Sequence, residues 1–209
     1  MWARVEDGNI IEIISHPKPI TVDEISHPRA IFTAWTDVDR INIGIYTVQQ
    51  AEKLDARFYI PKDPTYAVSG TEVIETIEKS ADKELTDTND VDENDNPVLD
   101  DHDNQTVTLG LKSKAKLKAD VDANRLLYIF DWLVQRKVTA DTAVPLDVLH
   151  YMAAVRTAHA SIHTAIDDAA DMPAFVVLHT EEYNEDGTLK TVRKVNDWPD
   201  DYEVKGYRR

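Results

Sequence analysis

The acidic segment Val91–Val107, "VDENDNPVLDDHDNQTV", concentrates the side chains most able to do chemistry. Carboxylate and amide oxygens are the ligands that Ca²⁺ prefers, and Asp92, Asn94, Asp101 and Asp103 are the candidate ligands. An EF-hand loop needs Gly at its sixth position and Glu at its twelfth, and this segment supplies neither. Two Asp-Asn pairs eight residues apart favour successive turns in a β meander. Calcium binding and a flexible acidic tract are the alternatives.

A second candidate for metal chemistry is the series His159, His163 and Asp167. These residues recur every fourth position, so on a helix they share one face. A helical His-x-x-x-His pair can hold a transition metal. The glutamate of the His-Glu-x-x-His motif is missing, however, and no convincing third ligand is evident. We therefore favour a polar face exposed to solvent or to another subunit, and expect no bound metal or cofactor.

The sequence lacks the other patterns that mark catalysis. It has no cysteine, which excludes disulfides, thiolate metal sites and cysteine nucleophiles. It contains no dinucleotide-binding or phosphate-binding glycine loop and no nucleophile elbow. The repeated "SHP", at residues 15–17 and 26–28, indicates extended, turn-like backbone. We therefore expect a protein that is not an enzyme.

The charge and hydropathy of the chain restrict its partners. The net charge is −16, most of it within residues 61–110, which argues against binding to nucleic acid or anionic membranes. No apolar run approaches the roughly 18 residues that a membrane helix needs, and the N-terminus lacks the pattern of a secretory signal. We expect a soluble protein made in the cytoplasm.

The first 56 residues are predicted to form a small β-rich module with one short helix. "MWARVEDGNIIEII" has the pattern of a hairpin, because Asp7-Gly8 suits a tight turn between two apolar strands. Thr36 is a suitable helix N-cap with Asp39 three residues later, and Gly44 suits the helix end. A strand is predicted directly after Gly44.

Residues 57–110 are predicted to form an acidic segment of hairpins and meanders. Pro61 and Pro64 disfavour helix, and the stretch "TEVIETIEKSADKEL" begins with residues typical of strands. With the other parts of the chain, this gives an α+β protein.

Residues 111–172 are predicted to form a helical hairpin. The first helix, "LKSKAKLKADVDANRLLYIFDWLVQRK", contains neither Gly nor Pro. Pro145 suits the first turn of the second helix, over about residues 146–170. Apolar residues recur at helical spacing on both: Leu117, Val121, Leu126, Phe130 and Leu133 (or Val134) on the first, and Leu146, Leu149, Met152, Ala153, Ile162 and Ile166 on the second. Residues 173–209 are predicted to form a β-hairpin from "AFVVLHTEEY" onwards, turning at Asn184–Gly187, and a tail.

Two stretches resemble proteins of tailed bacteriophages. The pattern "RLLYIFDWLVQRK…VPLDVLHYMAAVR…WP" resembles the tail assembly chaperone-like domain of tail-fibre-associated proteins. The matching residues are Arg125, Leu126, Leu127, Asp131, Trp132, Pro145, Tyr151, Ala154, Arg156, Trp198 and Pro199. "MWARVEDGNIIEI" with "RAIFTAWTDVDRINIGIYTV" is similar to small N-terminal modules of phage tail proteins.

The resemblance implies structural positions without catalysis. Trp132 is expected to pack between the two helices, and Asp131 to pair with Arg125 or Arg156. Trp2, Trp35, Trp132 and Trp198 are expected to be core or interface anchors, with Tyr151 as a further structural position.

The functional hypothesis is a non-enzymatic virion structural protein of a tailed phage. It would be a tail-fibre, baseplate or connector-associated component, assembled in the host cytoplasm, that contacts other tail proteins and forms homo-oligomers. The alternatives are a tail-fibre assembly chaperone absent from the mature virion, and a calcium-dependent binding module.

Overall fold

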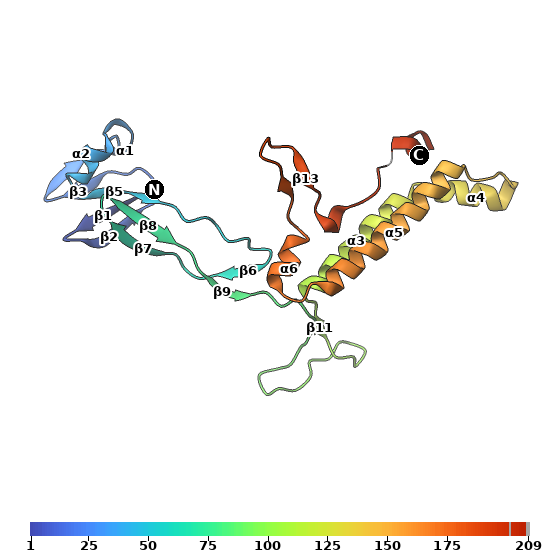
Figure 1. Ribbon diagram of the computed structural model, residues 1–209. Coiled ribbons are helices and arrows are strands. Elements are labelled where there is room, and N and C mark those ends of the chain that lie inside the picture. Colours follow the sequence, from blue (N-terminus) through green and yellow to red (C-terminus); the bar gives the residue numbers. More distant parts are fainter. Residues whose placement is uncertain (201, 208–209) are drawn as a thin grey trace. The chain divides into compact units, whose positions relative to one another are not determined.

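The computed structural model describes residues 1–200 and 202–207 (Figure 1). It has the expected mixed α+β fold. The chain forms two compact units, Met1–Asp82 and Lys83–Arg209. The expected segment of residues 57–110 is divided between them, and each unit is described by itself.

The first unit is built on a five-stranded sheet with the order β2-β1-β5-β8-β7. Neighbouring strands are antiparallel except β5 and β8, which are parallel. The expected N-terminal hairpin is confirmed, because Asp7 and Gly8 both have positive φ, 49° and 77°, between strands β1 and β2. The strands are β1 (Trp2–Glu6), β2 (Asn9–Ile14), β5 (Ile45–Gln49), β7 (Thr65–Ser69) and β8 (Glu72–Thr76).

Both faces of this sheet are covered. Successive strand residues point to opposite faces, so on β1 Ala3 and Val5 face one core while Trp2 faces the other. The sheet curls, and its edge strands β2 and β7 contact each other around the first core. The second core is completed by β3 (Ile20–Val22) and α1 (Ile31–Ala34). β4 (Ile25–His27) pairs with β3, and α2 (Asp37–Ile41) contacts β5.

The helix signals in this unit are confirmed. Thr36 caps α2, and its hydroxyl and the Asp39 carboxylate form the reciprocal capping box. Gly44 follows α2 with φ 75° and leads directly into β5. A Cβ on Gly44 would lie 2.6 Å from the carbonyl oxygen of Val5, so this position requires glycine.

The predicted strand over "TEVIETIEKSADKEL" is also confirmed, as β8 and then β9 (Lys79–Asp82), which pairs with β6 (Tyr59–Pro61).

The second unit contains the predicted helical hairpin, in which α3 and α5 run side by side (Figure 1). The first predicted helix is interrupted, because residues Ile129 and Phe130 separate α3 from α4. The helices are α3 (Leu111–Tyr128), α4 (Asp131–Ala140), α5 (Leu146–Asp168) and α6 (Met172–Val177), with 3₁₀ turns η1 (Lys194–Asn196) and η2 (Tyr202–Tyr207).

The start of α3 is capped from outside the helix. Its N-cap is Gly110, which has no side chain, and the carbonyl oxygens of Glu84 and Leu85 accept hydrogen bonds from the N–H groups of Leu111 (2.9 Å) and Lys112 (3.0 Å). The Asp87 carboxylate accepts hydrogen bonds from Gly110 N (2.8 Å) and Ser113 Oγ (2.9 Å). A Cβ on Gly110 would lie 2.4 Å from the carbonyl oxygen of Thr86, so only glycine fits this junction.

The predicted apolar stripes are partly wrong. Phe130, Leu133, Met152, Ile162 and Ile166 are buried as expected. Five other residues that were expected in the core are exposed instead: Leu117, Val121, Leu146, Leu149 and Ala153. The buried face of α3 instead carries Ala119, Asp122 and Ala123. Apolar residues occur on two faces of α3, and periodicity alone does not say which face meets α5.

The C-terminal hairpin is shorter than predicted. The prediction of strand from Ala174 is wrong, because Met172–Val177 form α6. Asp171 caps this helix by accepting a hydrogen bond from Ala174 N (2.9 Å), and Pro173 suits its first turn. The hairpin itself is β12 (Glu182–Tyr183) with β13 (Leu189–Thr191). Its predicted turn is confirmed, with φ 81° at Gly187.

Candidate functional site

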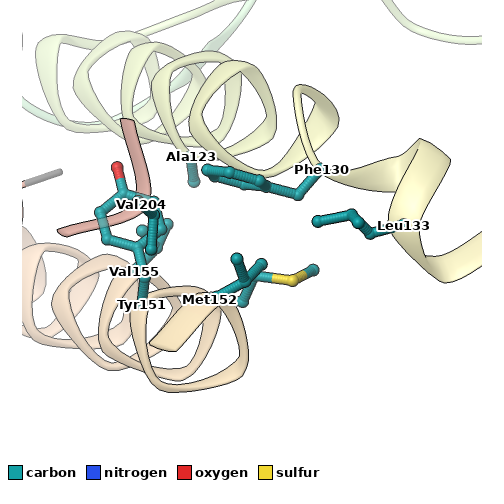
Figure 2. Close-up of a cluster of buried hydrophobic side chains, with 8 residues drawn as sticks. Ala123, Phe130, Leu133, Tyr151, Met152, Val155 and Val204 are labelled. Carbon is teal, nitrogen blue, oxygen red and sulfur yellow. The ribbon is translucent and has the colours of Figure 1, made fainter. Parts of the chain in front are cut away.

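A hydrophobic cluster of the second unit, here called the helical core, lies among its helices (Figure 2). Figure 2 shows Phe130 and Tyr151 facing each other across it; their ring centroids are 5.6 Å apart in an edge-on arrangement. The buried members are Ala123, Phe130, Leu133, Val148, Tyr151, Met152, Val155 and Val204. Several residues of the phage-like pattern therefore serve packing, because Leu126, Leu127, Trp132 and Trp198 also pack against this core.

Trp132 connects α4 to the C-terminal segment. Its indole Nε1 donates a hydrogen bond to the carbonyl oxygen of Tyr207 at 3.2 Å, and the Arg136 guanidinium lies 5.2 Å from its ring centroid. Trp198 and Pro199 line a shallow groove along α5. The two tryptophans thus hold the C-terminal segment against the helices, as anchors do.

The expected pairing of Asp131 with an arginine is wrong. Arg125 lies 3.8 Å from Asp122, one helical turn earlier, and within the described part of the chain neither Arg125 nor Arg156 forms an ion pair with Asp131. The break after Tyr128 places exposed Asp131 at the start of α4 instead of on the helix that carries Arg125.

The other two tryptophans, Trp2 and Trp35, lie in the first unit. Trp2 packs against the second core of that unit, and the centroid of its ring lies 4.7 Å from that of Phe32. Trp35 is exposed and meets His27 edge-on at 5.6 Å. Trp2 is therefore a core residue, whereas Trp35 remains a candidate interface residue.

The acidic segment forms two matching turns, here called the acidic hairpins (residues 91–97 and 99–105). In the first, Asp92 Oδ1 accepts hydrogen bonds from the backbone N–H groups of Asn94 (2.8 Å) and Asn96 (2.9 Å). In the second, Asp100 Oδ1 accepts hydrogen bonds from the backbone N–H groups of His102 (2.8 Å) and Asn104 (3.0 Å). The predicted turns are confirmed, although the left-handed residues are Asp95 and Asp103 instead of the asparagines.

The two acidic hairpins are joined by a closed ring of backbone hydrogen bonds. Val98 N donates to Asp90 O (3.0 Å), Thr106 N donates to Val98 O (2.8 Å), and Asp90 N donates to Thr106 O (2.9 Å). These three residues are spaced by eight, like the Asp-Asn pairs. β10 (Thr88–Asn89) and β11 (Val107–Thr108) close the base. The repeat in the sequence is thus a repeat in structure.

This geometry favours turn formation over calcium coordination. Backbone N–H donors hold the pKa of Asp92 below its usual value, and donors in the second hairpin act likewise on the pKa of Asp100. Among the residues that the structure describes, Asp92, Asp101 and Asp103 do not converge on one ligand position. Asn94, the fourth candidate, lies in the first hairpin, while Asp101 and Asp103 lie in the second.

A different group of metal-binding side chains does converge, here called the histidine–aspartate cluster (Asp120, His159 and His163). Asp120 Oδ1 on α3 lies 2.6 Å from His159 Nε2 and 3.0 Å from His163 Nε2, both on α5. The two imidazole centroids are 4.3 Å apart. The two histidines share one helix face as predicted, but the third member of the cluster is not Asp167, which ion-pairs with Lys116.

The electrostatics of the cluster centre on Asp120. The hydrogen bond with His159 and the nearby charge of His163 hold the pKa of Asp120 below its usual value, although partial burial opposes this shift. His163 Nε2 is shielded from solvent and close to the carboxylate, but it is not aligned for a hydrogen bond. An open cavity of about 400 Å³ borders the cluster and is lined by Asp120, Ala123, Asn124, Leu127, Arg156 and His159.

Sequence reasoning missed Asp120 because it lies 39 residues from His159. Nothing near Asp120 in the sequence marks it as a partner of two histidines. Only the register in which α3 packs on α5 brings them together.

Comparison with known proteins provides no relative for this chain. No protein-family model, no curated protein and no solved structure matches it. Within the described residues, no helix has both the length and the apolar character needed to cross a lipid bilayer.

Proposed function

We propose that the chain is a non-enzymatic structural protein of a tailed-phage virion, which acts in the tail through protein–protein contacts. The observation that carries the proposal is an apolar row on the outer side of α3, here called the outer stripe (Leu117, Val121 and Tyr128). These side chains are 52%, 65% and 75% exposed. Such a row on a charged protein is typical of a surface that another protein covers.

The outer stripe is separate from the helical core. Its residues are spaced by four and seven positions, so they share one face of α3. Ala119 and Ala123 lie on the opposite, buried face. The stripe is therefore not needed for packing α3 against α5. Exposed Val134 and Val138, one turn apart on α4, add apolar surface to the same unit.

The resemblance to phage tail proteins gives the proposal its context. Five of the eleven residues that carry it pack in or against the helical core, as a structural role requires. The proposed partners are further copies of the chain and other tail proteins, and the proposed location is the tail of the virion.

Mass spectrometry of purified phage particles tests the virion assignment. A structural component is expected at a fixed ratio to the other tail proteins. Absence from particles, together with co-purification with a fibre protein from infected lysate, would instead identify an assembly chaperone. Absence from both would reject both roles.

Light scattering tests the outer stripe directly. Wild type is expected to form oligomers, and Val121→Lys is expected to shift the mass towards the monomer because the new charge lies in the apolar contact. Thr164→Lys is the matched control, since it adds the same charge at an exposed position of another helix, α5. A monomeric wild type, or equal effects of both substitutions, would contradict homo-oligomerisation through the stripe.

A further inference from the structure

The side chains of the histidine–aspartate cluster do not satisfy all of their own hydrogen-bonding groups. One carboxylate oxygen of Asp120 faces two imidazole nitrogens, at 2.6 Å and 3.0 Å. His159 Nε2 forms a hydrogen bond with it, whereas His163 Nε2 is shielded from solvent without an aligned partner. A buried nitrogen in this state has lost its water without gaining a full replacement, which is costly.

We propose that Asp120, His159 and His163 bind one divalent transition-metal ion of the zinc class. Imidazole nitrogen and carboxylate oxygen are the ligand types that zinc takes, and three protein ligands with one open position are a common coordination set. Two nitrogen ligands favour zinc over calcium or magnesium, which prefer oxygen alone. The proposal concerns the second unit and does not depend on the proposed role in the virion.

The observed spacing is close to what a tetrahedral ion needs. Bonds of about 2.0–2.1 Å separate neighbouring ligand atoms by roughly 3.3 Å. The two distances from Asp120 Oδ1 are 2.6 Å and 3.0 Å, and all three ligand atoms lie within 4.8 Å of one another. The two distances from Asp120 Oδ1 to the imidazole nitrogens therefore need to lengthen by less than about 1 Å, which rotation of partly exposed side chains can supply.

The surroundings leave the fourth position accessible. The cavity of about 400 Å³ beside the cluster is open, so a water molecule or an anion can reach the ion. Arg156 lines this cavity, and its positive charge favours an anionic fourth ligand. Further charged groups are nearby. Asp167 ion-pairs with Lys116, and the Lys112 ammonium donates a hydrogen bond to the Asp167 carbonyl oxygen at 2.9 Å.

The ion would link two helices. Asp120 belongs to α3 and both histidines belong to α5, so a bound ion adds a cross-link that the unfolded chain lacks. A ligand that binds only the folded state raises its stability. At zinc concentrations about 100-fold above Kd, Tm is expected to rise by roughly 8–11 °C.

Equilibrium dialysis of the full, tag-free chain with Zn²⁺ tests the proposal. Metal is first removed with a chelator, and bound zinc is then measured by mass spectrometry. Wild type is expected to bind one zinc ion per chain, and His163→Gln and Asp120→Asn are expected to weaken binding at least tenfold. His150→Gln is the matched control, because His150 is an exposed histidine of α5 outside the cluster.

A second measurement needs no variant. In NMR spectra of wild-type imidazole nitrogens, Zn²⁺ is expected to shift the signals of His159 and His163 and to leave that of His150 unchanged. This readout still applies if a cluster variant fails to fold. Absence of zinc binding, unchanged affinity in folded His163→Gln, or shifts at other histidines would overturn the proposal.

Discussion

Replacing Phe130 by alanine tests whether the helical core stabilises the second unit. The side chain is fully buried where α3 ends and α4 begins, and its ring packs edge-on against Tyr151. Alanine removes these contacts and leaves a cavity between α4 and α5. Buried Phe-to-Ala substitutions typically cost about 3–5 kcal/mol of unfolding free energy.

This cost converts into a large thermal shift. For a unit the size of Lys83–Arg209, each kcal/mol lowers Tm by about 3–4 °C, so the expected loss is roughly 10–20 °C. Far-UV circular dichroism is the appropriate assay, because the long helices belong to this unit and their signal reports its unfolding.

Tyr128→Ala is the matched control for Phe130→Ala. It removes an aromatic side chain two positions earlier, but that side chain is 75% exposed. Its expected effect on the unfolding of the monomer is within about 0.5 kcal/mol. Equal Tm losses in the two variants would refute the assignment of Phe130 to the core.

Further predictions concern glycine and the cap of α3. Gly44→Ala is expected to destabilise the first unit by more than about 1 kcal/mol, because residue 44 has a positive φ and an added Cβ would collide with the Val5 carbonyl oxygen. Gly70→Ala is its control, because it has positive φ but open space, and the urea midpoints should differ accordingly. Asp87 is expected to contribute stability that is present at neutral pH. Hydrogen bonds from Gly110 N and the Ser113 hydroxyl hold the pKa of Asp87 below its usual 3.8, so its contribution is lost as pH falls from about 4 through the lowered pKa. Asp87→Asn should flatten this acid dependence in urea unfolding curves measured across that range, and an unchanged curve would contradict a stabilising role for these two hydrogen bonds.

The sequence by itself determined the local features of this protein. The Asp7-Gly8 hairpin, the Thr36 capping box and the two acidic turns each depend on residues within five positions of one another. In these cases the side chain supplies the hydrogen bond or tolerates the φ that the turn requires, so no distant partner is needed. The existence of two long helices also followed from composition.

Tertiary structure alone decided the contacts between elements. Apolar side chains occur on two faces of α3, and only packing against α5 selected the face of Ala119 and Ala123 for burial. The break after Tyr128 moved Asp131 away from its expected arginine partners. The same packing placed Asp120 beside His159 and His163, because the register of two helices is set by their whole interface and not by any local pattern.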